Sequence, residues 1–153
     1  MLLTVFSDTH GNTDGMLAAV AEHRPDMALH LGDHSRDADL LRAEFPDLPV
    51  VSVRGNCDIL SDAPEKEILQ LEGLRLFLCH GHEYSVKFTL DSLLNAVHFS
   101  GAKLGLFGHT HIAEYRNYGD LALLNPGSAG KGERSYGLLT IEGGKWEWKL
   151  AYL

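Results

Sequence analysis

Short apolar runs alternate with segments of helical spacing over the first third of the chain. The runs predict three buried strands, at residues 2–6, 27–31 and 48–53. Two helices are expected between them, a longer one that ends near Pro25 and a shorter one at residues 39–45. The longer helix is capped by Asn12 or Thr13, and its apolar face carries Leu17, Val20 and Ala21. Strands that alternate with helices in this way favour right-handed crossovers between parallel strands.

Strands dominate the rest of the chain. The runs at 66–71 and 74–79 flank Glu72-Gly73, which is a two-residue hairpin signal. An amphipathic helix at 89–99 is predicted by the helical spacing of Leu90, Leu93, Leu94 and Val97. Further strands are expected at 103–107, 113–118, 121–124, 136–141 and 145–152, with a glycine-rich loop from Asn125 to Gly132. Together these elements predict one α/β domain over residues 1–153, a four-layer sandwich of two mixed β-sheets flanked by helices.

The composition is that of an ordinary globular protein, with 44% hydrophobic and 22% charged residues. The formal net charge of −8 argues against a surface that grips a nucleic-acid backbone, so we expect no stable nucleic-acid binding. Two cysteines give no disulfide framework in a chain of this length. No apolar run is long enough for a signal peptide or a membrane span. These features predict a cytoplasmic protein without a membrane partner.

Five of the predicted strands end at glycine and polar residues that suit metal binding. The five segments are Asp8-Thr9-His10, Gly32-Asp33, Gly55-Asn56, His80-Gly81-His82 and Gly108-His109-Thr110-His111. Ligands of α/β sheets bind at the carboxyl ends of strands, so these segments can meet at one place. If the backbone stays extended after the first strand, Asp8 and His10 project to the same side. Carboxylate, amide and imidazole groups suit Mn²⁺, Fe²⁺ or Zn²⁺, and their number fits two ions that share a carboxylate.

In this order, the five segments resemble the motifs of the calcineurin-like metallophosphoesterases. The short chain, and Gly-Asn-Cys-Asp in the third segment, are most similar to the compact bacterial and archaeal phosphodiesterase subgroup. A eukaryotic retromer subunit, which is a protein-interaction scaffold, has the same fold. The resemblance extends from Leu2 to beyond Ser128 and implies the metallophosphoesterase fold.

The resemblance also implies a role for each matching residue. One metal ion would be held by Asp8, His10 and His111, the other by Asn56, His80 and His109, and both would share Asp33. The implied cofactors are two divalent ions, Mn²⁺ first, with Fe²⁺, Zn²⁺ or Ni²⁺ as alternatives. The implied reaction is the hydrolysis of a small phosphodiester by a hydroxide bound between the ions. The alternative is a non-catalytic protein-interaction scaffold of the same fold, and a homodimer or higher homo-oligomer is compatible with either function.

The chain departs from the family pattern directly after Asn56. Many members have a histidine there that is thought to protonate the leaving group, whereas this chain has Cys57. Asn56 and Cys57 are the candidate catalytic residues. A thiol with a pKa of about 8.5 is, however, a poorer proton donor. Asp58, His34, His82 or water are the alternatives for this proton transfer.

Several other residues have chemistry that packing explains more simply. We expect core or surface packing for His23, His30, Cys79, His98, Trp146 and Trp148. The segment Asn125 to Ser128 resembles a stretch that lies near the site in family members. Lys131 and Arg134 follow it, and we expect them in a solvated loop rather than on a substrate phosphate.

Overall fold

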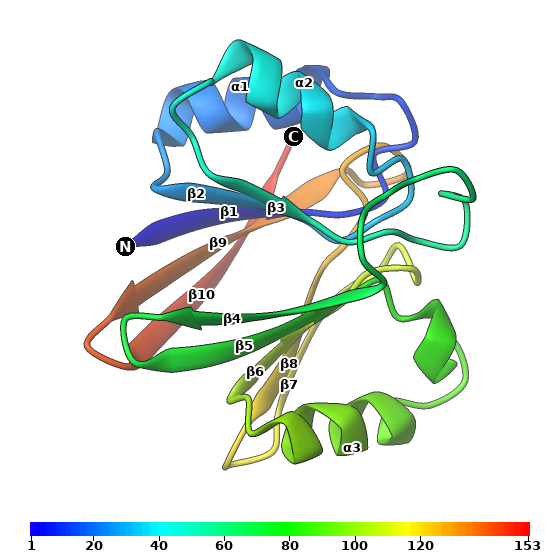
Figure 1. Cartoon of the computed structure of the whole chain (residues 1–153), viewed down its shortest axis with the longest axis vertical. Coiled ribbons are helices and arrows are strands. Elements are labelled where there is room, and N and C mark those ends of the chain that lie inside the picture. The colour runs from blue at the N-terminus through cyan, green and yellow to red at the C-terminus, as the bar shows by residue number, and fades with distance from the viewer.

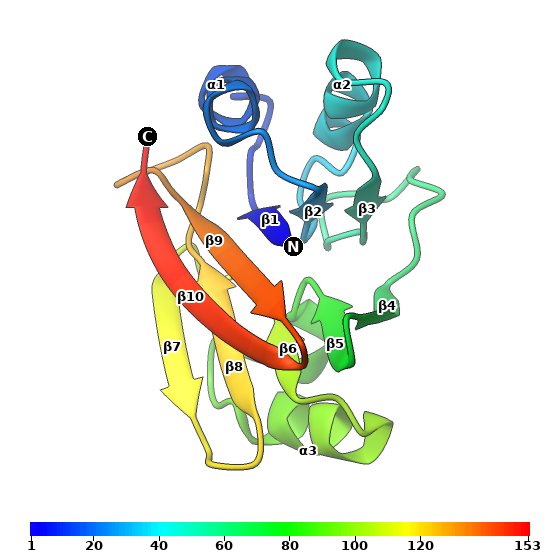
Figure 2. The same ribbon diagram turned by 90° about the vertical axis from the view of Figure 1, so that its left-hand side faces the viewer.

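The computed structural model describes residues 1–153, and its ten strands form two five-stranded sheets that pack face to face (Figure 1). The helices α1 (Asp14–His23) and α2 (Asp37–Glu44) cover the outer face of one sheet. The helix α3 (Asp91–Ser100) covers the outer face of the other. Figure 2 shows this order of layers, with α1 and α2 side by side at the top and α3 at the bottom. The predicted four-layer α/β sandwich is confirmed.

The first sheet has a parallel centre and an antiparallel edge, in the order β10-β9-β1-β2-β3. Its parallel strands are β1 (Leu2–Phe6), β2 (Met27–His30) and β3 (Val50–Ser52), joined by the crossovers that contain α1 and α2. The hairpin of β9 (Ser135–Glu142) and β10 (Lys145–Tyr152) pairs antiparallel with β1. The C-terminal hairpin therefore completes the sheet of the N-terminal half.

The second sheet has the order β4-β5-β6-β8-β7. Its three parallel strands are β5 (Leu74–Cys79), β6 (Leu104–Leu106) and β8 (Ala122–Pro126). The antiparallel strands β4 (Lys66–Leu71) and β7 (Ala113–Asn117) form its two edges. Each sheet thus contains three parallel strands, and the loops that follow most of them meet on the right-hand side of the molecule in Figure 1.

The burial of β1 on both faces explains why its sequence is an almost continuous apolar run. Leu3 and Val5 lie between the two sheets, in the same core cluster as Leu76 of β5. Phe6 lies on the opposite face and packs in the cluster that contains Met16 of α1. Side chains alternate between the faces of a strand, so a strand that is covered on both faces is apolar along its whole length.

The buried stripe of α1 differs from the predicted one. Met16, Ala19 and Val20 are buried, whereas Ala21 is exposed. The helix begins at Asp14, one turn before the first apolar residue of the predicted stripe, and no side-chain hydrogen bond caps it. The angular position of the stripe is set by the contact with the sheet rather than by the apolar residues alone.

The end of β8 and the segment after β5 also differ from the prediction. β8 continues through Pro126, so Asn125 belongs to a strand and the glycine-rich loop begins only at Gly127. A 3-10 turn, η1 (His82–Tyr84), follows β5, and no pattern in the sequence predicted it. No helix of the protein is both long enough and apolar enough to cross a membrane.

Candidate metal centre

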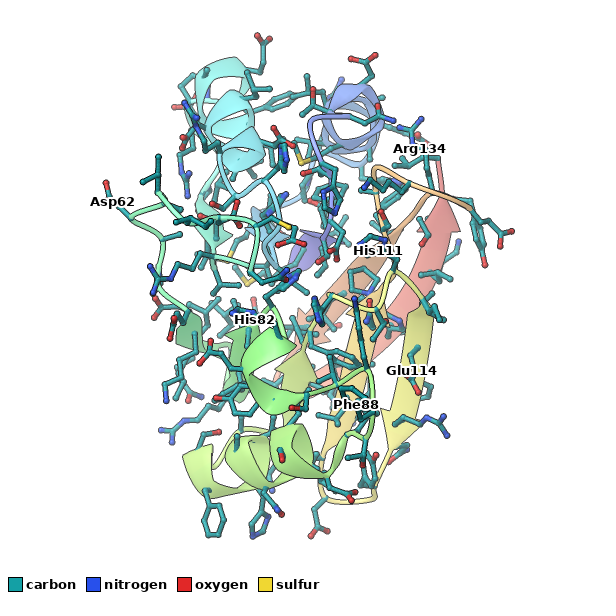
Figure 3. All side chains as sticks on the ribbon, turned by 90° about the vertical axis from the view of Figure 1, so that its right-hand side faces the viewer. Asp62, His82, Phe88, His111, Glu114 and Arg134 are labelled. Carbon is teal, nitrogen blue, oxygen red and sulfur yellow. The ribbon has the colours of Figure 1, made fainter.

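Six of the seven predicted ligands lie together where the parallel strands end. They are Asp8, His10, Asp33, His80, His109 and His111. The loops after β1 and β2 supply the first three, and the loops after β5 and β6 supply the others. Figure 3 looks onto this side of the molecule, with His82 and His111 near its centre.

The ligand atoms of the first group lie within 4.8 Å of one another. This group contains Asp8, His10, Asp33 and His111. His111 Nε2 lies 3.1 Å from Asp8 Oδ1, and His10 Nε2 lies 3.7 Å from Asp33 Oδ2. Two carboxylates and two imidazoles are a donor set that suits a divalent transition-metal ion.

The second group shares one residue with the first. It contains Asp33, His80 and His109, again within 4.8 Å. His80 Nε2 lies 3.4 Å from Asp33 Oδ2 and 3.2 Å from His109 Nδ1. Asp33 therefore belongs to both groups, which is the arrangement expected of a carboxylate shared by two ions.

The seventh predicted ligand, Asn56, lies after β3, in the loop that contacts Asp33. Its side chain is exposed, and its Nδ2 atom lies 3.7 Å from Cys57 Sγ. The backbone N–H of Cys57 donates to Asp33 Oδ1 at 3.0 Å, which fixes this loop against the shared carboxylate. The role of Asn56 as a ligand stays a prediction.

The backbone turns sharply at the ligands, so the expectation of an extended segment after β1 is wrong. The φ angles of Asp8 and His10 are +53° and +48°, and those of His109 and His111 are +69° and +62°. Few residues other than glycine adopt this left-handed conformation, and such residues cluster at functional sites. The side chains of Asp8 and His10, and those of His109 and His111, therefore converge because both residues of each pair have left-handed backbone conformations, and not because of the pleat of an extended strand.

Two glycines are required by the close approach of the loops. A Cβ atom at Gly108 would overlap Ser7 Oγ and lie 2.8 Å from Asp8 Oδ2. A Cβ atom at Gly55 would overlap the carboxylate of Asp33. Neither glycine has a positive φ angle, so both serve the close packing of the loops rather than a left-handed turn.

The polar atoms of the site fit divalent cations. Asp8 is fully buried, and its Oδ2 accepts hydrogen bonds from Ser7 Oγ at 2.6 Å and from the N–H of His109 at 3.1 Å. Asp8 Oδ1 and His10 Nε2 are also buried, yet neither has a hydrogen-bond partner. His80 Nδ1 donates to the carbonyl of Leu31 at 2.7 Å, which leaves its Nε2 atom turned toward Asp33. Ions bound by these groups would satisfy the atoms that lack partners.

Burial and charge act in opposite directions on the pKa values of the site. Burial by itself raises the pKa of Asp33, but hydrogen bonds from His80 and Cys57 reverse this and hold it well below its usual range. Burial lowers the pKa of His80, but the hydrogen bond to Asp33 and the nearby carboxylate charges raise it above its ordinary value. Burial and the charge of His80 lower the pKa of His109 to about 4. The shared carboxylate is thus ionised, and one imidazole of the second group is neutral.

Several residues that hold the ligand loops were not recognised in the sequence. Ser128 Oγ donates to the carbonyl of Asp8 at 2.8 Å, and Asn125 Nδ2 donates to the carbonyl of Gly108 at 3.1 Å. Asp58, a proposed proton donor, instead accepts from the N–H groups of Gly55 at 2.8 Å and Ser35 at 3.0 Å. Its buried carboxylate joins the loops after β2 and β3, so it is a positioning residue.

His30 is fully buried, as expected of a packed residue, but it also joins two ligand loops. Its Nδ1 accepts from the N–H of Gly32 at 3.2 Å, and its Nε2 lies 2.9 Å from Thr9 Oγ1. Burial lowers its pKa to about 4. The neutral ring therefore carries its proton on Nε2 and donates to Thr9. A buried histidine two residues before Gly32-Asp33 was the signal that could have revealed this link.

The residues around the ligand groups are either candidates for proton transfer or basic side chains of the glycine-rich loop. His34, whose ring centroid is 5.4 Å from that of His10, and His82, 5.5 Å from that of His80, remain candidates for proton transfer. Burial of the His10 ring lowers its pKa, and the positive charge of Lys131, which is exposed in the loop, lowers it further. Arg134 Nε donates to the carbonyl of Ala129 at 3.0 Å, so this side chain supports its own loop.

The other residues that we expected in core or surface packing lie outside the ligand groups. Cys79 is fully buried at the end of β5, and His98 is exposed on α3. His23 lies 2.7 Å from the hydroxyl of Tyr136. Trp146 and Trp148 are partly buried against the core between the sheets. None of these residues belongs to the two ligand groups.

Known proteins with similar sequences are named as metallophosphoesterases or phosphodiesterases. The profile of the "Calcineurin-like phosphoesterase superfamily domain" matches residues 1–144. A Bacillus subtilis protein named probable metallophosphoesterase YsnB is 30% identical over 149 residues, which cover 93% of this chain and 85% of that protein. Phosphodiesterase YfcE of Escherichia coli K12 is 34% identical over 103 residues, which cover 59% of this chain and 52% of that protein.

Solved structures of similar fold cover nearly the whole chain. A conserved protein of Streptococcus pneumoniae, described as a predicted phosphoesterase, has a TM-score of 0.84 and 24% identity, covering 99% of this chain and 88% of that one. Vps29 of Entamoeba histolytica, complexed with zinc, has a TM-score of 0.78 and 22% identity, covering 99% of each chain. At these identities the likeness shows the fold, and it confirms the predicted fold class.

Proposed function

The chain belongs to the calcineurin-like phosphoesterase superfamily, and from this premise we propose that it hydrolyses phosphodiesters with two divalent ions. The observation that carries the proposal is the pair of ligand groups that meet at Asp33. The mixed carboxylate and imidazole donors favour Mn²⁺, with Fe²⁺, Zn²⁺ or Ni²⁺ as alternatives. Hydrolysis of a diester rather than a monoester is supported by the name of the E. coli relative.

Divalent ions held by these groups would lower the pKa of water and offset the negative charge that develops on the phosphoryl oxygens. In the reaction, water adds to phosphorus, the P–O bond to the leaving group breaks, and the leaving oxygen takes up a proton. Asp8 and Asp33 contribute fixed negative charge, because both carboxylates are buried and held by hydrogen bonds. The carbonyl of Leu31 keeps His80 Nε2 turned toward Asp33.

The proton for the leaving oxygen has three candidate sources at the edge of the site. Burial and the charge of Asp33 raise the pKa of the Cys57 thiol, which makes it a weak acid at neutral pH. His34 and His82 are imidazoles that belong to neither ligand group. We propose that one of them protonates the leaving group and that Cys57 contributes little.

The test is the hydrolysis of bis(p-nitrophenyl) phosphate by chelator-treated protein to which Mn²⁺ is added back. Activity should return with the metal, and calorimetry should count two ions per chain. Asp33→Asn should bind fewer ions and lose activity, whereas Asp47→Asn, an exposed acidic residue between α2 and β3, should behave as the wild type. Folded protein that hydrolyses no diester with any of the four metals would contradict the proposal.

Failure of that test would favour the scaffold alternative, which the Vps29 likeness in fold makes the relevant one. All six clustered ligand positions are filled by competent donors, which a pure scaffold does not require. The net charge of −8 makes a nuclease that holds long DNA a poor alternative. We therefore propose a small phosphodiester as the substrate.

A further inference from the structure

Two cavities lie next to each other beside the loop that follows β3. The inner cavity has a volume of about 310 Å³, and His34, Cys57 and Ile59 are among its lining residues. The outer cavity, of about 670 Å³, extends between the start of α2 and residues 60–64. Arg36, Leu60 and Ser61 line both cavities. We call the two together the Arg36 groove.

The inner end of the Arg36 groove opens at the ligand groups. His34, which lines it, has its ring centroid 5.4 Å from that of His10. Cys57, which also lines it, donates its backbone N–H to Asp33 Oδ1 at 3.0 Å. A phosphate held at Asp33 would therefore have one of its ester groups directed into the groove.

Arg36 is an unpaired positive charge in the lining of the inner cavity. Its side chain forms no ion pair and no hydrogen bond, whereas neighbouring Arg42 pairs with Asp39 at 2.7 Å. The one acidic residue in the lining of the inner cavity, Asp58, is buried and engaged by the N–H groups of Gly55 and Ser35. A free guanidinium beside a metal centre is suited to a second phosphate, which it can bind through two parallel hydrogen bonds.

The opposite wall of the inner cavity is apolar and exposed. Ile59 is 84% exposed and Leu60 is 97% exposed, so neither side chain packs in a core. Figure 3 shows Asp62, two residues further along this loop, at the left-hand edge of the molecule. Large apolar side chains next to a free cation are typical of pockets that bind a ligand with both an apolar ring and a charged group.

We propose that the Arg36 groove binds the leaving-group portion of a nucleotide phosphodiester, with Arg36 on a second phosphate and Ile59 and Leu60 against the base. This inference rests on the proposed function, because it places the scissile phosphate at Asp33. It makes the preferred substrate a diester that carries a further phosphate beyond the scissile bond.

The experiment compares thymidine dinucleotides that have no terminal phosphate with those that have one at the 5′ or the 3′ end. For the wild type with Mn²⁺, kcat/KM should be about tenfold higher for one of the phosphorylated forms, through a lower KM. Arg36→Gln should reduce this ratio to near one, and Arg36→Lys should retain part of it because the charge remains. Leu60→Ser should lower kcat/KM of all three dinucleotides about threefold relative to bis(p-nitrophenyl) phosphate.

The matched control is Lys145→Gln, which changes the net charge equally in the β9–β10 hairpin, at the end of the sheet away from the ligand loops (Figure 1). It should keep the wild-type ratio. A wild type without preference, or an Arg36→Gln variant that keeps it, overturns the inference while bis(p-nitrophenyl) phosphate hydrolysis still supports the proposed function. Calorimetric binding of the same dinucleotides decides the inference even if no diester is hydrolysed. Tighter binding of a phosphorylated dinucleotide that is lost in Arg36→Gln would support the inference. Equal binding of all the dinucleotides by the wild type would overturn the inference.

Discussion

The two sheets bring unlike chemistry to the site. Strands of the first sheet end at both carboxylates, Asp8 and Asp33, and strands of the second sheet end at three imidazoles. Both carboxylates are buried, and hydrogen bonds hold the pKa of Asp33 well below its usual range, whereas His111 is exposed and burial lowers the pKa of His109 to about 4. The first sheet therefore supplies the carboxylates that attract cations, and the second sheet supplies imidazole donors that set where the cations lie.

Replacing one donor from each sheet gives the largest expected difference. Asp8→Asn should reduce kcat/KM about a thousandfold, roughly 4 kcal/mol of transition-state free energy, because a neutral amide replaces a buried charged donor. His111→Gln, on the exposed side of the same group, should cost about ten- to a hundredfold. The measurement is hydrolysis of bis(p-nitrophenyl) phosphate at saturating Mn²⁺.

Unfolding in the presence of a chelator separates loss of the site from loss of the fold. The amide oxygen of Asp8→Asn can still accept from Ser7 and His109, and the buried charge is gone. The urea midpoint without metal should therefore not fall. Mn²⁺ at about a hundred times its Kd should stabilise the wild type by roughly 2.7 kcal/mol and the variant by much less. Equal losses of activity in both variants would contradict the division of roles between the sheets.

The contact between the two sheets can be tested at Gly108, which lies against Ser7 and Asp8 of the other sheet. Gly108→Ala should lower kcat/KM about a hundredfold and the unfolding free energy by roughly 1–3 kcal/mol, because the added methyl group displaces Asp8. Gly119→Ala, in the β7–β8 turn with open space around it, should cost about 1 kcal/mol of stability through its positive φ. Its activity should stay within twofold of the wild type. Equal activities of the two variants would show that the close approach is unimportant.

The order of elements was predictable because the pattern of apolar residues in a strand reflects whether one or both of its faces are buried. β1 is covered on both faces and is apolar except at Thr4, and the helical spacing of Leu93 and Val97 matches their burial in α3. The hairpin at Glu72-Gly73 was placed correctly for a local reason, the conformation of a two-residue turn. Element ends were less exact, since β8 gains Asn125 and Pro126 by pairing with Glu114 and Ala113 at the open end of the β7–β8 hairpin.

The candidate ligands were predictable because strand ends concentrate at one edge of a sheet, but the way they converge was not. The left-handed turns at Asp8 and His10 depend on loops from three other strands, which no local pattern encodes. The same is true of Asp58, whose sequence position fits a proton donor but whose carboxylate is taken up by two backbone N–H groups. Exposed residues such as Ile59 carry no periodic signal at all.

Within the first sheet, the burial of His30 predicts that the stability of the fold depends on pH. Its pKa is about 4 in the fold, because burial outweighs the nearby charges of Asp37, Asp58 and Asp8 that act in the opposite direction. The unfolded chain binds a proton at His30 below pH of about 6.5, whereas the folded chain does not until about 4. Stability from this group is therefore complete above pH 6.5 and is lost as the pH falls toward 4.

Urea unfolding at pH 7 and pH 5 in the presence of a chelator measures this effect. His30 should account for a loss of about 2 kcal/mol between these pH values. His30→Gln keeps a polar side chain without a titratable ring, so its loss should be smaller by about that amount. His98→Gln, an exposed position on α3, should show the wild-type difference. If His30→Gln and the wild type lose equally, His30 is not held neutral in the fold.

The smallest expected effect concerns Cys57, where the first sheet lacks the histidine that many family members have. Cys57→His places an imidazole at the rim of the inner cavity, beside the loop that donates to Asp33. It should raise kcat for the thymidine dinucleotide about tenfold, because an alkoxide leaving group needs a proton. The rate with bis(p-nitrophenyl) phosphate should change less than twofold, since nitrophenolate leaves without one. Cys57→Ser, which adds no acid, should match the wild type on both substrates. If Cys57→His also matches the wild type on both, the proton already comes from His34 or His82, and His34→Gln and His82→Gln then identify which sheet supplies it.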